Sequence, residues 1–113
     1  MPEGPEIRLA ADKIAKIIEG KVIEDIEVGL PRLVEPSQKL KGIKVEKVET
    51  RGKAMLIHFA NGFIIYSHNQ LYGVWKTTKR GHFPKTNRSL RLALHTKQKS
   101  ALLYSASDIA VYD

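Results

Sequence analysis

The chain has 113 residues, a length typical of one domain with a single packed core. It contains no cysteine, which excludes disulfides and thiolate metal sites. Its four histidines, at positions 58, 68, 82 and 95, lack the close spacing of a metal motif, so we expect surface or packing roles for them. Because there is no signal-peptide pattern and the longest apolar runs are only MLI and FIIY, we expect a soluble, cytoplasmic protein outside the membrane.

The formal net charge of +7 is distributed unevenly along the chain. Residues 1–50 carry nine basic and ten acidic side chains, whereas residues 51–113 carry ten basic and two acidic ones. Residues 51–107 include no acidic side chain at all. Solvated basic surfaces usually mix charges of both signs, so this pattern favours a polyanionic partner, and nucleic acid is the leading candidate.

The first part of the chain predicts one clear helix. Apolar residues recur at helical spacing between Ile7 and Ile18, and Gly20 is typical of the position just past a helix end. Residues 22–28 (VIEDIEV) predict a strand. Residues 30–36 (LPRLVEP) contain two prolines and predict a loop, after which SQKLKG could form one helical turn.

From Ile43 onward the pattern predicts strands, at residues 43–49, 54–59, 63–67, 71–77, 90–95 and 101–105. Asn61-Gly62 between two apolar runs predicts a tight hairpin in which both central residues have positive φ. Residues 79–88 form a basic loop, and leucines alternating over residues 90–95 predict a half-buried strand. The tail SASDIAVYD stops without a turn or cap, which suggests a chain cut from something longer.

These elements predict a mainly β fold with some α-helix. The expected architecture is a β-sandwich, or a closed sheet, of about seven to eight strands. The amino-terminal helix, and an optional second short helix, would cover its edge.

The opening PEGPE has two readings. Proline suits the first turn of a helix, where Glu3 and Glu6 would complement the helix dipole. Alternatively, removal of Met1 would leave Pro2 with a free secondary amine. An α-amine of pKa about 8 is roughly a tenth neutral at pH 7, whereas a lysine is neutral in only about one molecule in two thousand.

The second reading is chemically coherent. A secondary amine that attacks an aldehyde-level carbon forms an iminium, which acts as an electron sink and makes the adjacent C–H acidic. Glu3 or Glu6 could then move protons, and a cation such as Lys53 nearby would lower the pKa of the amine further. The residues alone leave both readings open.

Three stretches carry a resemblance to a known family: MPEGPEIRLAAD, ETRGKAMLIHFANG and YSHNQLYGVWK. Together they resemble the amino-terminal domain of the bacterial Fpg/Nei family of DNA glycosylases. Within that family PEGPE, SHNQLYGVW and LLYSASDI look like the endonuclease VIII (Nei) branch. The resemblance covers essentially the whole chain, and the motifs occur in the family's order.

The resemblance implies base-excision repair of DNA that carries oxidised pyrimidines, by a bifunctional glycosylase and AP lyase. Pro2 matches the nucleophile that attacks C1′ and forms the Schiff base, and Glu3 matches the proton donor at the sugar. Glu6 matches a supporting carboxylate. Lys53 matches a lysine that contacts phosphate and donates a proton during β-elimination, which δ-elimination follows.

The resemblance also implies a DNA-binding surface. Gln70, Leu71 and Tyr72 match the loop that enters the duplex and fills the gap left by the extruded nucleotide. Their structural alternative is that Leu71 and Tyr72 start a strand and pack in the core. Candidates for the phosphate-facing surface are Arg51, Lys76, Lys79, Arg80, Lys85 and Arg88.

The chain departs from the family in length. Family members are more than twice as long, with a carboxy-terminal domain that holds a helix–two-turn–helix and a zinc finger. We therefore expect residues 1–113 to be the amino-terminal catalytic domain, with no cofactor of its own and zinc only in the domain that this chain lacks. We expect a monomer that binds damaged double-stranded DNA in the bacterial cytoplasm, at the nucleoid, with little activity alone because positioning supplies much of the rate.

Two alternative functions stay open. The chain could be a DNA-binding fragment without catalysis, either because it is truncated or because a retained Met1 turns the Pro2 nitrogen into an amide. It could also be a small enzyme that uses an amino-terminal proline as general base, like a tautomerase. That last reading leaves the basic second half unexplained.

Overall fold

The computed structural model describes residues 4–52, 54–68, 74–86, 89–105 and 108–112. In chain order its elements are α1 (Gly4–Ile18), β1 (Asp25–Val28), the 3-10 helix η1 (Pro31–Leu33), α2 (Val34–Gln38), β2 (Val45–Arg51), β3 (Ala54–Phe59), β4 (Ile64–His68), β5 (Val74–Lys79), β6 (Leu90–His95), β7 (Lys99–Tyr104) and β8 (Asp108–Tyr112). No helix in these ranges is long and apolar enough to cross a membrane.

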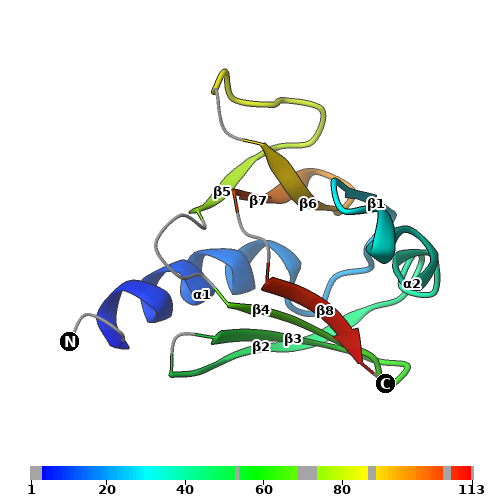
Figure 1. Cartoon of the computed structure of the whole chain (residues 1–113), viewed down its shortest axis with the longest axis horizontal. Helices are drawn as coiled ribbons and strands as arrows, with labels where there is room; N and C mark the ends of the chain where they lie inside the picture. Colours follow the sequence, from blue (N-terminus) through cyan, green and yellow to red (C-terminus); the bar gives the residue numbers. More distant parts are fainter. Residues whose placement is uncertain (1–3, 53, 69–73, 87–88, 106–107, 113) are drawn as a thin grey trace.

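The described strands form two four-stranded antiparallel sheets, in the orders β1-β6-β7-β5 and β2-β3-β4-β8. The sheets face each other as two layers, and α1 packs against β2 and β3 of one sheet and β5 and β7 of the other (Figure 1). The predicted fold class, a mainly β sandwich with an amino-terminal helix at its edge, is confirmed.

Helix α1 is held by its apolar side. Ile14 and Ile18 are fully buried and Ala11 nearly so, while Asp12 and Lys13 between them are exposed. Gly20, with φ of 77°, ends the helical segment, and its N–H donates to the Val45 carbonyl at 2.8 Å. The 3.6-residue period therefore predicted this helix and the side that it buries.

The core between the sheets is built from the inward positions of each strand. Its largest fully buried side chains include Met55, Ile57, Phe59, Ile65, Leu94, Leu103 and Ile109. Each such residue contributes about 1.5–3 kcal/mol by leaving water. Because α1 adds Ile14 and Ile18 to this same cluster, its position is fixed by the core that orders the sheets.

The hairpin between β3 and β4 is confirmed, but the predicted turn conformation is wrong. Only Gly62 has a positive φ, 92°. Phe59 N–H donates to Phe63 O at 2.8 Å, and Gly62 N–H donates to Phe59 O at 3.0 Å, so three residues form the loop. The Asn61 side chain, which accepts from Phe63 N–H at 3.2 Å, stabilises this arrangement, in which only the last loop residue is left-handed.

Residues 30–36 are not the loop that their prolines predicted. They form η1 and then α2, which ends at Gln38 instead of extending through SQKLKG. Pro31 lies at the first turn of η1 and Pro36 in the first turn of α2, where the missing proline N–H costs no helical hydrogen bond. Leu33 and Leu40 are buried and hold this segment against the core.

Three further expectations differ in detail. β1 begins at Asp25 instead of at residue 22. The strand at residues 90–95 is not half-buried: Ala93 and His95 are buried too, because Ala93 packs with Leu102 and Tyr104 on the outer face of the sheet. The tail contains β8, which pairs antiparallel with β4 and was not predicted.

Gly29 predicts a measurable steric effect. Its N–H donates to Arg91 O at 2.9 Å, and a Cβ there would lie 2.1 Å from the Leu90 carbonyl oxygen. We expect Gly29→Ala to lower the free energy of unfolding by about 1–3 kcal/mol, because the backbone must move apart. Gly42→Ala is the control, with open space around its Cβ but a φ of 84°, so only about 1 kcal/mol of strain is expected. A urea midpoint for Gly29→Ala equal to that of the unchanged chain would contradict this packing.

Candidate active site

Most of the residues predicted for catalysis or DNA binding lie outside the described part of the chain. These are Pro2, Glu3, Lys53, Gln70, Leu71, Tyr72 and Arg88. Glu6 lies in α1, where the backbone is described and the side chain is not. The site is therefore defined by the described segments that flank these positions, and the roles themselves stay predictions.

Helix α1 runs antiparallel to β2. At its carboxyl end, Glu19 and Gly20 meet Val45 at the start of β2. Towards its amino end, Arg8, Ala11 and Asp12 line a hollow of about 280 Å³ together with Val48, Glu49 and Thr50 near the end of β2. The amino terminus of α1 therefore points to the same end of the sandwich as the turn between β2 and β3.

The other flanking segments reach that end as well. Arg51 pairs with Ala54 across the β2–β3 turn, and Ala54 pairs with His68 at the end of β4. The amino end of α1, the β2–β3 turn, the end of β4 and the start of β5 all lie on the left in Figure 1. The described segments that flank the positions predicted for the nucleophile, the lysine and the wedge thus lie at the same end of the sandwich.

Several predicted phosphate-facing cations can be located. Arg51 is exposed, with its Nε 3.8 Å from Glu49 Oε2. Lys76 is half-buried and lines a hollow of about 360 Å³ between α1 and β5. Lys79 and Lys85 are exposed and form no ion pair with any described residue.

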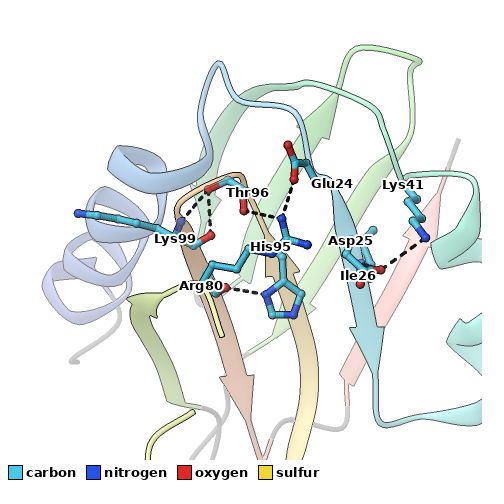
Figure 2. Close-up of polar contacts among 9 residues, drawn as sticks. Glu24, Asp25, Ile26, Lys41, Arg80, His95, Thr96 and Lys99 are labelled. Atoms are coloured by element: carbon cyan, nitrogen blue, oxygen red, sulfur yellow. Dashed lines mark hydrogen bonds and ion pairs between the residues drawn. The ribbon is translucent and has the colours of Figure 1, made fainter. Parts of the chain in front are cut away.

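Arg80 has a structural role that the sequence did not predict. Its Nη1 donates to Glu24 Oε1 at 2.6 Å and to the Thr96 carbonyl at 3.4 Å (Figure 2). Its charge is therefore shared with an acidic partner and is less available to a phosphate than that of Lys79. No local signal could reveal this pair, because Arg80 and Glu24 are 56 residues apart.

His95 is packed and hydrogen-bonded inside the fold, whereas His58 hydrogen-bonds to Glu49. Buried His95 forms two hydrogen bonds, one between Nδ1 and the Ser100 hydroxyl at 2.6 Å and one between Nε2 and Glu27 Oε2 at 2.7 Å. The Phe83 ring packs edge-on against His95, with 6.0 Å between ring centroids. Together with the Arg80 contacts, this holds residues 80–83, the first part of the basic loop, against the end of β6 and the β6–β7 turn. No group of three potential metal ligands occurs among the described residues.

Glu49 is the described carboxylate with a shifted pKa near this end. A side-chain hydrogen bond from His58 is the main cause that lowers its pKa below 4.5, and the charges of Lys47 and Arg51 add to the effect. The carboxylate is thus the favoured form beside the cationic β2–β3 turn. It balances part of the local positive charge.

This pKa shift predicts a pH dependence of stability. A lowered folded-state pKa means that the unfolded chain binds the proton more tightly, so stability is present above pH 4.5 and is lost as pH falls through the folded-state pKa. We expect Glu49→Gln to be less stable than the unchanged chain well above pH 4.5, and the difference to shrink as the pH falls through the folded-state pKa of Glu49. Thermal unfolding across this pH range measures the difference in stability between Glu49→Gln and the unchanged chain. A difference that stays constant down to the lowest pH would contradict the interaction of Glu49 with His58.

These features define a class: a two-sheet β-sandwich whose amino-terminal helix packs against both sheets and runs beside β2 towards the β2–β3 end. The sequence-family model of the formamidopyrimidine-DNA glycosylase N-terminal domain matches residues 1–107 of this chain. The chain therefore belongs to the Fpg/Nei family of DNA glycosylases and corresponds to the amino-terminal part of its members.

Curated relatives point to one branch of the family. The chain is 54% identical over 109 residues to Endonuclease 8 of Escherichia coli O17:K52:H18 and 53% identical over the same length to Endonuclease 8 of Salmonella agona. Each match covers 96% of this chain and 41% of the relative. The chain thus spans less than half the length of the curated relatives that it matches.

Solved structures support the fold. Lactococcus lactis Fpg bound to DNA containing an abasic site superposes with a TM-score of 0.83 at 19% identity, over 97% of this chain and 43% of that one. Wild-type Lactococcus lactis Fpg with DNA containing an oxidised pyrimidine gives a TM-score of 0.83 at 19% identity, over 98% and 44%. At this identity the likeness establishes the fold.

Proposed function

We propose that the chain is the amino-terminal catalytic domain of a bifunctional DNA glycosylase and AP lyase that removes oxidised pyrimidines from duplex DNA. The observation that carries the proposal is the 54% identity to Endonuclease 8 over 96% of the chain. The convergence of α1, the β2–β3 turn and the flanks of residues 69–73 supports it, because the reaction needs a nucleophile, a proton donor and a wedge at one place.

The proposed chemistry starts at the amino terminus. After Met1 is removed, the Pro2 nitrogen attacks C1′ of the damaged nucleotide, the C1′–N bond to the base breaks, and the base leaves with a proton. Glu3 transfers protons at the sugar, and Glu6 supports it from α1. Loss of the ring oxygen bond at C1′ gives a cationic iminium between Pro2 and the opened sugar.

The iminium then makes strand cleavage possible. It acidifies the neighbouring C2′–H, so the proton leaves C2′ and the 3′ phosphate is expelled by β-elimination, and δ-elimination then expels the 5′ phosphate. We assign Lys53 the proton donation in β-elimination and a phosphate contact. This chemistry needs no cofactor, because the iminium itself is the electron sink.

The proposed DNA contacts divide into two groups. Gln70, Leu71 and Tyr72 enter the duplex and offset part of the few kcal/mol lost when a nucleotide is extruded. Arg51, Lys76 and Arg88 contact phosphates, which orients the duplex without reading sequence. The absence of acidic residues over positions 51–107 supports this surface. We propose action as a monomer on chromosomal DNA in the bacterial cytoplasm.

A cleavage assay tests the proposal. The Met1-free chain is incubated with an end-labelled duplex containing one abasic site and, as control, the same duplex without it. We expect cleavage only at the abasic site, with phosphate at both new ends, and a rate below that of a full-length relative. Salt-dependent duplex binding without cleavage would instead identify a DNA-binding fragment. Proton exchange on keto acids that is unaffected by DNA would identify a tautomerase-like enzyme.

A further inference from the structure

A groove of about 440 Å³ lies at the opposite end of α1 from the candidate active site. Its walls are the last turns of α1, the segment at residues 21–24, and the turn between β6 and β7. None of the residues assigned to catalysis, to the wedge or to phosphate contacts is among its lining residues. Its volume is within the range of specific ligand pockets.

Four lysines surround this groove: Lys16, Lys21, Lys97 and Lys99. All four are exposed, and none forms an ion pair with another residue in the described ranges. Glu24 is the one acidic residue among the lining residues, and its carboxylate is already paired with Arg80 (Figure 2). The groove therefore carries positive charge that its own acid does not neutralise.

Hydrogen bonds of the β6–β7 turn hold the walls of the groove in place. Thr96 N–H donates to Lys99 O at 2.8 Å, and Lys99 N–H donates back to Thr96 Oγ1 at 3.1 Å. Arg80 N–H donates to Gln98 O at 2.9 Å, which ties this turn to the end of β5. Figure 2 shows the Lys99 side chain extended in the direction of α1. The lysines thus project from anchored backbone.

The uncharged part of the groove is aliphatic. Ile17 is half-buried there, and Val22 is 47% exposed. Its described lining residues include no aromatic ring and no guanidinium group. Single-stranded nucleic acid is usually held by aromatic stacking, which these lining residues do not provide. Ammonium groups beside an aliphatic surface suit carboxylates that flank an apolar side chain.

We propose that this groove binds an acidic peptide segment of a partner protein. An aliphatic side chain of the peptide packs on Val22 and Ile17, and its carboxylates lie against Lys97 and Lys99 on one side and Lys16 and Lys21 on the other. The site is separate from the proposed catalytic end, so a partner bound there leaves the DNA-facing end free.

Binding of a defined peptide tests this site. The probe is a fluorescein-labelled peptide of about ten residues in which glutamates flank two leucines, and anisotropy measures its affinity for the 113-residue chain. We expect Lys97→Glu combined with Lys99→Glu to weaken binding by about tenfold or more. Lys39→Glu combined with Lys41→Glu is the charge-matched control, because neither residue lines the groove. It removes an exposed ion pair of Lys41 with Asp25 and a contact of Lys39 with the Phe63 ring, both of small free energy, and we expect an effect on peptide affinity within about twofold.

Further measurements complete the test. A peptide with serines in place of the leucines is expected to bind the unchanged chain more weakly, and both double variants should melt at a similar temperature and cleave abasic-site DNA at similar rates. Equal weakening by the two double variants would overturn the proposal, since it would show only non-specific attraction. It would also be overturned if the groove variant lost affinity for an oligothymidylate probe while it kept the peptide.

Discussion

Borohydride is expected to link the chain covalently to abasic-site DNA at least about a hundredfold faster when Met1 has been removed than when it is present. With Met1 present the Pro2 nitrogen is an amide and has no nucleophilic lone pair. The Met1 amine would then be the alternative nucleophile, but it lies one residue, about 3.8 Å, from the Pro2 position. Because a displacement of about 1 Å can cost about a hundredfold in rate, we expect at least that loss in the rate of adduct formation.

The comparison needs one preparation in two forms. The Met1-bearing chain is divided, one half is treated with a methionine aminopeptidase, and intact mass verifies both forms before borohydride is added. Duplex binding should be similar for the two forms, because neither the basic side chains nor the core changes. Equal adduct yields from both forms would show that another amine is the nucleophile.

Ile14→Ala is expected to lower the free energy of unfolding by about 2–5 kcal/mol. Ile14 is fully buried in the core cluster that joins α1 to both sheets, so the change leaves a cavity that the sheets cannot fill. Denaturant unfolding measures the loss. The same variant should also form less Pro2 adduct at equal folded concentration, since α1 is the element that carries the amino terminus.

Leu9→Ala provides the matched control on the same helix. Leu9 is 62% exposed, so its truncation removes little buried surface, and alanine is the better helix former. We expect a change within about 0.5 kcal/mol and an unchanged adduct yield. If Ile14→Ala were as mild as Leu9→Ala, α1 would not be fixed by the core in the way described.

Periodic segments of the sequence predicted their structure well. The strands at residues 54–59 and 90–95 were predicted to the residue, and α1 was identified from the helical spacing of its isoleucines. Each of these elements buries one side against a common core, so the pattern of apolar residues is itself the signal. Gly20 and Gly62 marked a helix end and a turn because both adopt a positive φ.

Less periodic segments were predicted poorly, for local reasons. Pro31 and Pro36 predicted a loop over residues 30–36, although both lie in first turns of helices, where proline is tolerated. β8 was missed because only Ile109 and Val111 of its five residues face the core, and its partner β4 lies some forty residues earlier, a separation no local window spans. The buried state of His95 depends on Phe83, Ser100 and Glu27, which come from other parts of the chain.

The candidate site divides in the same way. The motifs around Pro2, Lys53 and Leu71 are visible in the sequence, and the comparisons place the chain in the family that they indicated. The antiparallel course of α1 along β2 could not be read from the sequence, because it depends on contacts between Glu19 and Val45. The pairing of Arg80 with Glu24 likewise exists only in the folded chain. The same is true of the groove that Lys16, Lys21, Lys97 and Lys99 surround.

The most direct test of the central claim is to locate the adduct on the chain. After borohydride fixes the Met1-free protein to abasic-site DNA, nuclease and protease digestion leave a short sugar remnant on one peptide, and tandem mass spectrometry identifies the modified atom. The account predicts the remnant on the amino-terminal nitrogen of Pro2. A remnant on Lys53, or on any other lysine, with an unmodified Pro2 would contradict it.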